Sequence, residues 1–177
     1  MRLFIAIPLS ECIKENAMLI QSSLDKRIFR ITKKDQMHIT LAFLGDVDEK
    51  NINNIDKSLK NIKFKPFSIN TKSFGFFPAN NRIRIVWIGL ENNDEFIELQ
   101  KKVRSIFNFK DKLMPHITVA RAKKIIYDKE YLWTKKISQI KIKEKSMIVN
   151  NFILYESVPT NEGNIYKILK IYESNDY

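Results

Sequence analysis

The sequence predicts a fold of mixed strands and helices, in which two similar lobes are related by a pseudo-two-fold axis. Apolar residues alternate between short strand-like runs and stretches with helical periodicity. A strand–helix–strand pattern occurs twice, around residues 5–38 and 85–116. The second strand of each unit begins with nearly the same segment, HITLAF at 38–43 and HITVAR at 116–121. Such a repeat would bring two equivalent strands to face one cleft.

Length and composition favour one globular unit with a polyanionic partner. The 177 residues, 44% of them hydrophobic and 29% charged, suit a single two-lobed domain over residues 1–177. Lys and Arg total 31 against 20 Asp and Glu, so the net charge is +11. An isoelectric point near 9.6 indicates a nucleic acid, a nucleotide or an anionic surface as partner.

The residue inventory also excludes several classes of protein. A single cysteine, Cys12, allows no internal disulfide, and two histidines with one cysteine are too few for a structural zinc site. No apolar run reaches the length of a transmembrane helix. The apolar stretch at Met1–Pro8 is too short for a secretory signal. We therefore expect a cytoplasmic protein and, as the simpler state, a monomer.

The first unit opens with a strand at Arg2–Ile7. Apolar positions 13, 17, 20 and 24 share one helical face behind the N-cap residue Ser10, which predicts a helix. The second strand is expected at Met37–Leu44. Asp48 then caps a helix with apolar positions 52, 55, 59 and 62, and a strand follows at Phe67–Thr71.

The second unit follows a predicted turn at Phe74–Asn81, which holds Gly, Pro and two Asn. A strand is expected at Ile83–Ile88 and a helix from Asp94, and the motif strand follows at His116–Ala120. The remaining predictions are a short helix and three strands, in the order Asp128–Lys136, Ile137–Ile142, Ser146–Tyr155 and Ile165–Tyr172.

Both histidines of the chain are followed two positions later by threonine, as His38–Thr40 and His116–Thr118. Side chains at i and i+2 of a strand project from the same face, so each imidazole lies beside a hydroxyl. Two such pairs across a cleft can grip a phosphate. One neutral imidazole then acts as base and one imidazolium as acid, since histidine serves both roles near neutral pH.

The paired motifs resemble the two-histidine phosphoesterase superfamily and, within it, the RNA 2′,3′-cyclic phosphodiesterases, historically called 2′-5′ RNA ligases. Matching segments span nearly the full chain: 2–7, 38–45, 75–78, 86–90, 115–121 and 154–157. The resemblance implies an α+β fold with two lobes, antiparallel sheets lining a central cleft and helices outside. It also implies metal-independent hydrolysis of a 2′,3′-cyclic phosphate to a 2′-phosphate, with His38 as proton donor and His116 as proton acceptor.

The resemblance further places the residue five positions after each histidine near the nucleotide and phosphate. Arg121 would stabilise negative charge, as guanidinium groups pair well with phosphate, and Phe43 would stack on the base or shape its pocket. In a flat strand an offset of five points to the face opposite histidine. A bulge or a strong twist is therefore required.

Basic residues outside the motifs suggest further contacts with RNA. The stretch 121–145 is strongly basic and holds three aromatic residues, so it forms either an electrostatic track for RNA or a solvated face. Arg82 and Arg84 are candidates for a second phosphate contact. With four glycines and no glycine-rich phosphate loop, we expect no ATP site of the P-loop kind and no cofactor.

Alternative functions remain open on the residues alone. One is a 2′-5′ RNA ligase, or a phosphodiesterase for 2′-5′-linked or other cyclic nucleotides, because the same acid and base can run the reverse reaction. Another is a non-catalytic module that binds RNA or nucleotides. The presence of both histidines and both threonines weighs against the second.

Overall fold

Strands and helices follow one another largely in the predicted order. The computed structural model describes residues 1–78, 82–109, 113–127, 135, 143–161 and 163–175. Its helices are α1 (Glu11–Ser22), α2 (Ile52–Lys60) and α3 (Asp94–Ser105), with short 3₁₀ turns at Lys34–Gln36 and Glu49–Asn51. Its strands are β1 (Arg2–Pro8), β2 (Phe29–Ile31), β3 (His38–Asp46), β4 (Phe67–Phe77), β5 (Arg82–Leu90), β6 (His116–Tyr127), β7 (Ser146–Val149), β8 (Asn151–Thr160) and β9 (Gly163–Glu173).

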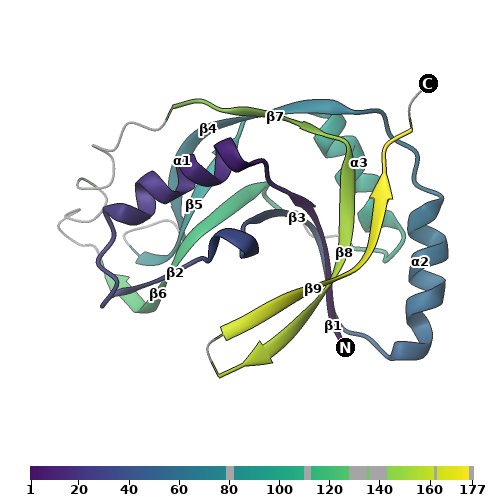
Figure 1. Cartoon of the computed structure of the whole chain (residues 1–177), viewed down its shortest axis with the longest axis horizontal. Helices are drawn as coiled ribbons and strands as arrows, with labels where there is room; N and C mark the ends of the chain where they lie inside the picture. Colours follow the sequence, from purple (N-terminus) through teal and green to yellow (C-terminus); the bar gives the residue numbers. More distant parts are fainter. Residues whose placement is uncertain (79–81, 110–112, 128–134, 136–142, 162, 176–177) are drawn as a thin grey trace.

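The described strands form one curled sheet, antiparallel throughout, with the order β7-β4-β5-β6-β3-β1-β8-β9 and with β2 beside β6 (Figure 1). The two repeat units, β1-α1-β3 and β5-α3-β6, meet at the central β3–β6 pair. Each motif strand has its unit's first strand on its outer side, so the order reads the same from both sides of the centre. This arrangement confirms the antiparallel α+β fold, and the duplicated units join in one continuous sheet.

Helices and core cover one face of the central strands. Ile39 of β3 and Ile117 of β6 are fully buried, as are Ile13, Ala17 and Ile20 of α1. Helix α1 packs against β6 and α3 packs against β3, so each helix contacts the motif strand of the other unit. Because strand residues alternate between faces, the histidines and threonines beside these isoleucines point to the uncovered face. The helices therefore lie outside, and the other face is free for a cleft.

Several element boundaries differ from the sequence-based expectation. Strand β4 runs to Phe77, because Gly75 pairs with Trp87 of β5 instead of turning. The segment expected as one strand at Ser146–Tyr155 is divided at Asn150 into β7, which pairs with β4, and β8, which pairs with β1. Strand β2 carries no clear pattern and was not expected. Ser10 stands at the N-cap of α1, but its side chain makes no capping hydrogen bond.

Some predictions fall where the structure gives no description. The strand expected at 137–142, nearly all of the short helix expected at 128–136, and most of the basic stretch 121–145 lie outside the described residues. The same holds for the end of the turn predicted at 74–81. Within the described part of the chain, no helix is long and apolar enough to cross a membrane.

Candidate active site

All six site residues predicted from the sequence line a single cavity of about 260 Å³. They come from the two central strands, β3 and β6: His38, Thr40, Phe43, His116, Thr118 and Arg121. The segment around β2 and the start of β9 complete the wall with Arg30, Thr32, Lys33, Gln36, Asn164 and Tyr166. The fold thus brings together residues that are up to 83 positions apart within the predicted set, from His38 to Arg121.

The register of the central strand pair arranges the two motifs symmetrically. Ile39 is the partner of Ile117 across the antiparallel β3–β6 pair. Continuing this register places His38 across from Thr118 and Thr40 across from His116. Facing residues on adjacent antiparallel strands lie about 5 Å apart. The two motifs therefore meet at this pair, and their histidines and threonines line the same cavity.

A one-residue bulge follows the threonine in both motifs. In β3, Thr40 and Ala42 face consecutive residues of β1, which leaves Leu41 as the extra residue. In β6, Thr118 and Ala120 face consecutive residues of β5, which leaves Val119 as the extra residue. Both extra residues are fully buried. Each bulge reverses the alternation of faces, so Phe43 and Arg121 join the face that carries the histidines. The sequence analysis required a bulge or a twist to bring the residue five positions after each histidine to the histidine face, and these two bulges do so.

The bulge in β6 is held by hydrogen bonds from outside the β5–β6 ladder. The carbonyl of Val119 accepts from the backbone N–H of Thr32 at 3.0 Å and from the side-chain amide of Gln21 at 3.0 Å. The same Gln21 amide nitrogen also donates to the carbonyl of Thr32 at 2.8 Å. Helix α1 thereby fixes the segment after β2 against the bulged strand, where that segment lines the cavity.

Both histidines are held in the same tautomer. Nδ1 of His38 lies 2.7 Å from the carbonyl oxygen of Gln36, and Nδ1 of His116 lies 2.8 Å from that of Met114. A carbonyl only accepts, so Nδ1 carries the proton in each neutral ring and donates it. Nε2 is then the basic nitrogen on each imidazole. The two motifs present equivalent proton-transfer atoms, each oriented by the backbone two residues upstream.

Aromatic rings surround His38. The ring centroid of Phe4 lies 5.0 Å from that of His38, and Tyr166 of β9 meets the imidazole edge-on at 5.5 Å. The tip of the β8–β9 hairpin is tied to the same place, because the side chain of Gln36 donates to the carbonyl of Asn164. Gln36 therefore connects the hairpin, through its side chain, to the carbonyl that orients His38.

His116 rests on a different set of rings. Phe77 meets it edge-on with centroids 5.1 Å apart, and Trp87 stacks on Phe77 at 5.0 Å. Trp87 in turn lies over Gly75, where a β-carbon would come within 2.8 Å of ring atoms Cε2 and Cη2. Only glycine lets the indole approach this closely. The Gly75 segment noted in the sequence therefore positions the rings that support the second histidine.

Burial makes both imidazoles weak bases. Loss of solvent around His38 lowers its pKa to about 4, and the positive charges of His116 and Arg121 act in the same direction, while the Gln36 carbonyl partly offsets them. Burial also lowers the pKa of His116, with Arg121 adding to the effect and the Met114 carbonyl opposing it. Both rings are thus neutral at pH 7 in the free cleft. An anion bound between them would raise both pKa values by favouring the charged form.

The side chains that the structure describes around the cavity are positively charged or neutral. Arg30, Lys33 and Arg121 all contribute to its wall, and no Asp or Glu is among the described lining residues. Arg82 and Arg84, considered from the sequence as phosphate contacts, do not line it. Arg82 lies over the ring of Tyr127, and Arg84 donates to the carbonyl of Lys123. A cavity of this composition favours anionic ligands.

Sequence reasoning missed the lining residues contributed by β2 and β9. Tyr166 falls in a strand that was expected, and Arg30 in one that was not. Neither residue belongs to a motif. No signal in the sequence could have placed them beside the histidines, because β2 and the β8–β9 hairpin reach the cavity only through long-range pairing and the curl of the sheet (Figure 1).

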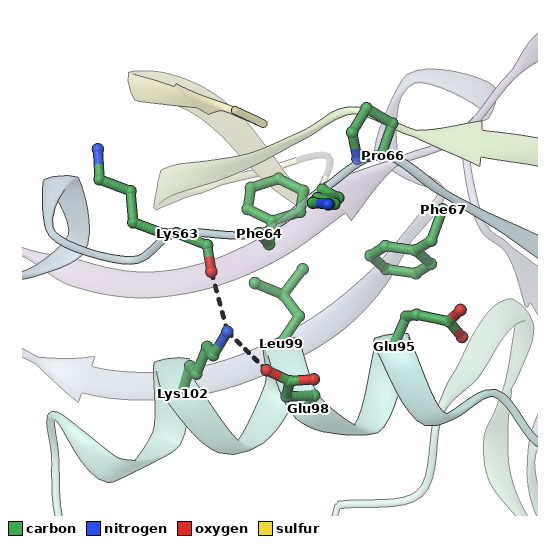
Figure 2. A pocket seen from close by; sticks show the side chains of 9 residues that line it. Lys63, Phe64, Pro66, Phe67, Glu95, Glu98, Leu99 and Lys102 are labelled. Carbon is green, nitrogen blue, oxygen red and sulfur yellow. Dashed lines mark hydrogen bonds and ion pairs between the residues drawn. The ribbon is translucent and has the colours of Figure 1, made fainter. Parts of the chain in front are cut away.

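A larger cavity, of about 480 Å³, lies between α3 and the segment that leads into β4 (Figure 2). Its floor is apolar, with Phe64, Phe67 and Leu99. Lys102 at its rim pairs with Glu98 at 2.7 Å and donates to the carbonyl of Lys63 at 2.9 Å. The described residues that line this larger cavity include no histidine and no side chain with a hydroxyl group. The smaller cavity, which holds both motifs, is the one equipped for acid–base chemistry.

Comparisons with known proteins agree with this site. A family model described as LigT-like phosphoesterase matches residues 7–87. The protein named RNA 2′,3′-cyclic phosphodiesterase of Thermotoga maritima is 38% identical, with 96% of this chain and 93% of the relative covered. Its namesake in Methanocaldococcus jannaschii is 35% identical, with 96% and 99% covered.

Solved structures show the same fold. A Thermus thermophilus protein superposes with a TM-score of 0.80 at 22% identity, covering 98% of this chain and 97% of that protein. Escherichia coli LigT in its apo form has a TM-score of 0.78 at 24% identity, with 99% and 98% covered. The relatives that are 38% and 35% identical over 96% of this chain, together with the matching family model, show that the chain belongs to the LigT-like phosphoesterase family.

Proposed function

We propose that this protein hydrolyses the 2′,3′-cyclic phosphate at the end of an RNA to a 2′-phosphate, without a metal ion. One observation carries the proposal: two His–Thr pairs meet in one cationic cavity, each with Nδ1 bound to a backbone carbonyl and Nε2 left for proton transfer. The relatives that are 38% and 35% identical over nearly the whole chain are named for this reaction. The cyclic phosphate carries the negative charge that such a cavity favours.

In the proposed mechanism, Nε2 of His116 accepts a proton from water as the water oxygen attacks phosphorus. The bond from phosphorus to the 3′ oxygen breaks, and His38 donates a proton from Nε2 to that oxygen. The 2′ ester bond stays intact, so the product is a 2′-phosphate with a free 3′ hydroxyl. Proton balance returns when His116 loses a proton and His38 regains one.

The low pKa of His38 places a condition on this assignment. A ring with a pKa of about 4 carries little charge at pH 7, and a proton donor must be charged before it acts. The proposed donor therefore gains its proton with the substrate, because the phosphate anion beside Nε2 stabilises the imidazolium. Binding of the cyclic phosphate and protonation of His38 are coupled.

The remaining side chains of the cavity hold the phosphate and the nucleoside. In the proposal, the hydroxyls of Thr40 and Thr118 donate to the non-bridging oxygens and Arg121 balances the charge that grows during attack. Phe43, whose side chain is 55% exposed, offers a ring for the terminal base or ribose. Binding of nucleotides is supported by a relative of the same fold, since E. coli LigT has been solved with 3′-AMP and with ATP.

The proposal includes the state in which the protein works. A monomer as the active unit remains a prediction from the sequence. A cytoplasmic location and the absence of a metal requirement remain predictions from the sequence.

The test is turnover of a short RNA that ends in a 2′,3′-cyclic phosphate, measured in excess chelator. We expect wild type to yield a 2′-phosphate and His116→Ala to yield none. A 3′-phosphate product would contradict the assigned bond cleavage, and dependence on added metal would contradict the mechanism. Parallel assays with 2′-5′-linked dinucleotides and with paired RNA ends separate hydrolysis from the alternative phosphodiesterase and ligase activities.

A further inference from the structure

Two arginines stand directly opposite each other at one end of the cavity. Strand β2 lies beside β6 (Figure 1), and its register sets Arg30 against Arg121. The neighbouring partners Phe29 and Ala122 are 1% and 2% exposed and face the core, so both arginines project from the other face, where they line the cavity. Adjacent strands are about 4.8 Å apart, which brings two positive side chains into close range.

Nothing in the described structure balances this pair. Like charges directly opposite on adjacent strands are destabilising, and proteins usually place a carboxylate nearby. The ion pairs among the described residues include neither Arg30 nor Arg121, and the cavity wall there has no Asp or Glu. Two guanidinium groups without a carboxylate form an arrangement suited to an oxyanion such as phosphate.

The charge of the cavity exceeds what the reacting group needs. A 2′,3′-cyclic phosphate is a monoanion, whereas Arg30 and Arg121 both line the cavity. Arg121 follows the bulge that brings it to the histidine face, and in the proposed function it serves the reacting phosphate. Arg30 lies on β2. Strands β2 and β3 both pair with β6, β3 beside the histidines and β2 further along the strand. Arg30 is therefore free for a second phosphate group beside the first.

We propose that Arg30 forms a second phosphate subsite, which binds the phosphodiester linking the terminal nucleotide to the one before it. This inference rests on the proposed function and deepens it: the protein prefers an oligonucleotide end over a nucleoside 2′,3′-cyclic phosphate. Arg30 sets this preference and takes no part in the proton transfers. A free nucleotide with several phosphates would offer the same chemistry, and the substrates below distinguish the two sources.

The experiment compares kcat/KM for uridine 2′,3′-cyclic phosphate with that for UpU ending in the same cyclic phosphate. Wild type and Arg30→Gln are measured on both substrates. Arg27→Gln serves as the matched control, because Arg27 lies three residues away, pairs with Asp25 at 2.7 Å and does not line the cavity. We expect Arg30→Gln to lower kcat/KM for the dinucleotide about tenfold to a hundredfold, as for a lost charged hydrogen bond. The loss of kcat/KM for the mononucleotide should be several-fold smaller than the loss for the dinucleotide.

Two further measurements identify the contact as a phosphate. A dinucleotide with an uncharged methylphosphonate in place of the internal phosphodiester should be insensitive to Arg30→Gln. For the normal dinucleotide, the slope of log kcat/KM against log salt concentration should become shallower by about 0.7 in the variant, the value for one phosphate contact on a single strand. If Arg30 only stabilised the fold, Arg30→Gln would lower kcat/KM equally for the charged and the methylphosphonate dinucleotides. It would also leave the salt slope unchanged.

Equal losses on both substrates would overturn the subsite, because Arg30 would then serve the reacting phosphate. Equal wild-type kcat/KM for the two substrates would overturn it as well. A wild type that turns over neither substrate overturns the proposed function, and the subsite is then judged by calorimetry with the 2′-phosphate forms of both ligands. Tighter binding of adenosine triphosphate than of the dinucleotide, lost in Arg30→Gln, would assign the subsite to free nucleotides and reject the oligonucleotide.

Discussion

Ile39 of β3 pairs with Ile117 of β6 at the centre of the sheet, and this pair sets the geometry of the site. Both side chains are fully buried on the helix-covered face. The residues on either side of them, His38 and Thr40 on one strand and His116 and Thr118 on the other, are therefore forced to the cavity face. The apolar core thus fixes the face of the sheet on which both motifs lie.

Replacement of either imidazole should remove nearly all turnover while leaving the fold intact. We expect His38→Ala and His116→Ala each to lower kcat by about 10²–10⁴-fold, the usual contribution of one general acid or base. Both side chains lie at the cavity, outside the packed core, so melting temperatures should stay close to that of wild type. Single-turnover rates with a cyclic-phosphate RNA check this, and wild-type turnover in either variant would contradict the two-histidine mechanism.

The two motif threonines should contribute less than the histidines. Replacing Thr40 or Thr118 with the isosteric valine removes one hydrogen bond to a charged group, which is worth about 1.5–3 kcal/mol, or roughly 10–150-fold in kcat/KM. Thr71→Val is a matched control. Thr71 is buried, as Thr40 is, but its hydroxyl bonds to the backbone of Lys145, away from the cavity. That variant should lose stability and keep its kcat. Unchanged kcat/KM in both motif variants would exclude the phosphate contacts.

The pH dependence of kcat/KM should have its maximum on the acidic side. This parameter reports the free enzyme, in which burial depresses both imidazole pKa values, that of His38 to about 4. One ring must be charged and the other neutral, so kcat/KM should rise up to about pH 4 and fall above the second pKa, which lies below 6.5. The profile of kcat should be displaced to higher pH, because bound phosphate raises both pKa values. A kcat/KM that stays flat from pH 6 to 8 would contradict this.

Burial of neutral His38 should also make stability depend on pH. Its pKa is about 4 in the folded protein and near 6.5 when unfolded, so the unfolded chain binds the extra proton between these values. The contribution is fully present above pH 6.5 and is lost as the pH falls toward 4, by an amount of up to about 3 kcal/mol. Urea unfolding of wild type and His38→Gln from pH 7 to 4 tests this. The difference between the two proteins should shift in favour of the variant at low pH.

The ring stack beneath His116 should depend on Gly75. An alanine there would place its β-carbon within 2.8 Å of Trp87, which would push the indole toward Phe77 and His116. We expect Gly75→Ala to cost about 1–3 kcal/mol of stability, as overpacking does, and to lower kcat. In a Trp87→Phe background, where the larger ring is absent, the same change should cost less. Equal costs in both backgrounds would show that the contact is not the cause.

The duplicated strand–helix–strand pattern and the two His–Thr pairs could be predicted from the residues alone, whereas Phe43 and Arg121 were implied by the resemblance to the phosphoesterase family. Apolar periodicity reports burial directly, so Ile39 and Ile117 were assigned to the core and His38 and His116 to the other face. The offset of five before Phe43 and Arg121 also required a bulge, and the structure contains one after each threonine. These features follow from local rules, namely alternation along a strand and the period of a helix.

The distant segments that complete the site became apparent only in the folded chain. The register between β3 and β6 places the two motifs opposite each other, and the pairing of β2 with β6 brings Arg30 to Arg121. Tyr166 of β9 contacts His38, although the two residues are far apart in the sequence. The low pKa of His38 also arises from this packing, since desolvation depends on what surrounds the ring. Pairing between strands and burial of a polar ring depend on contacts across the whole chain, and no single segment carries a pattern that encodes them.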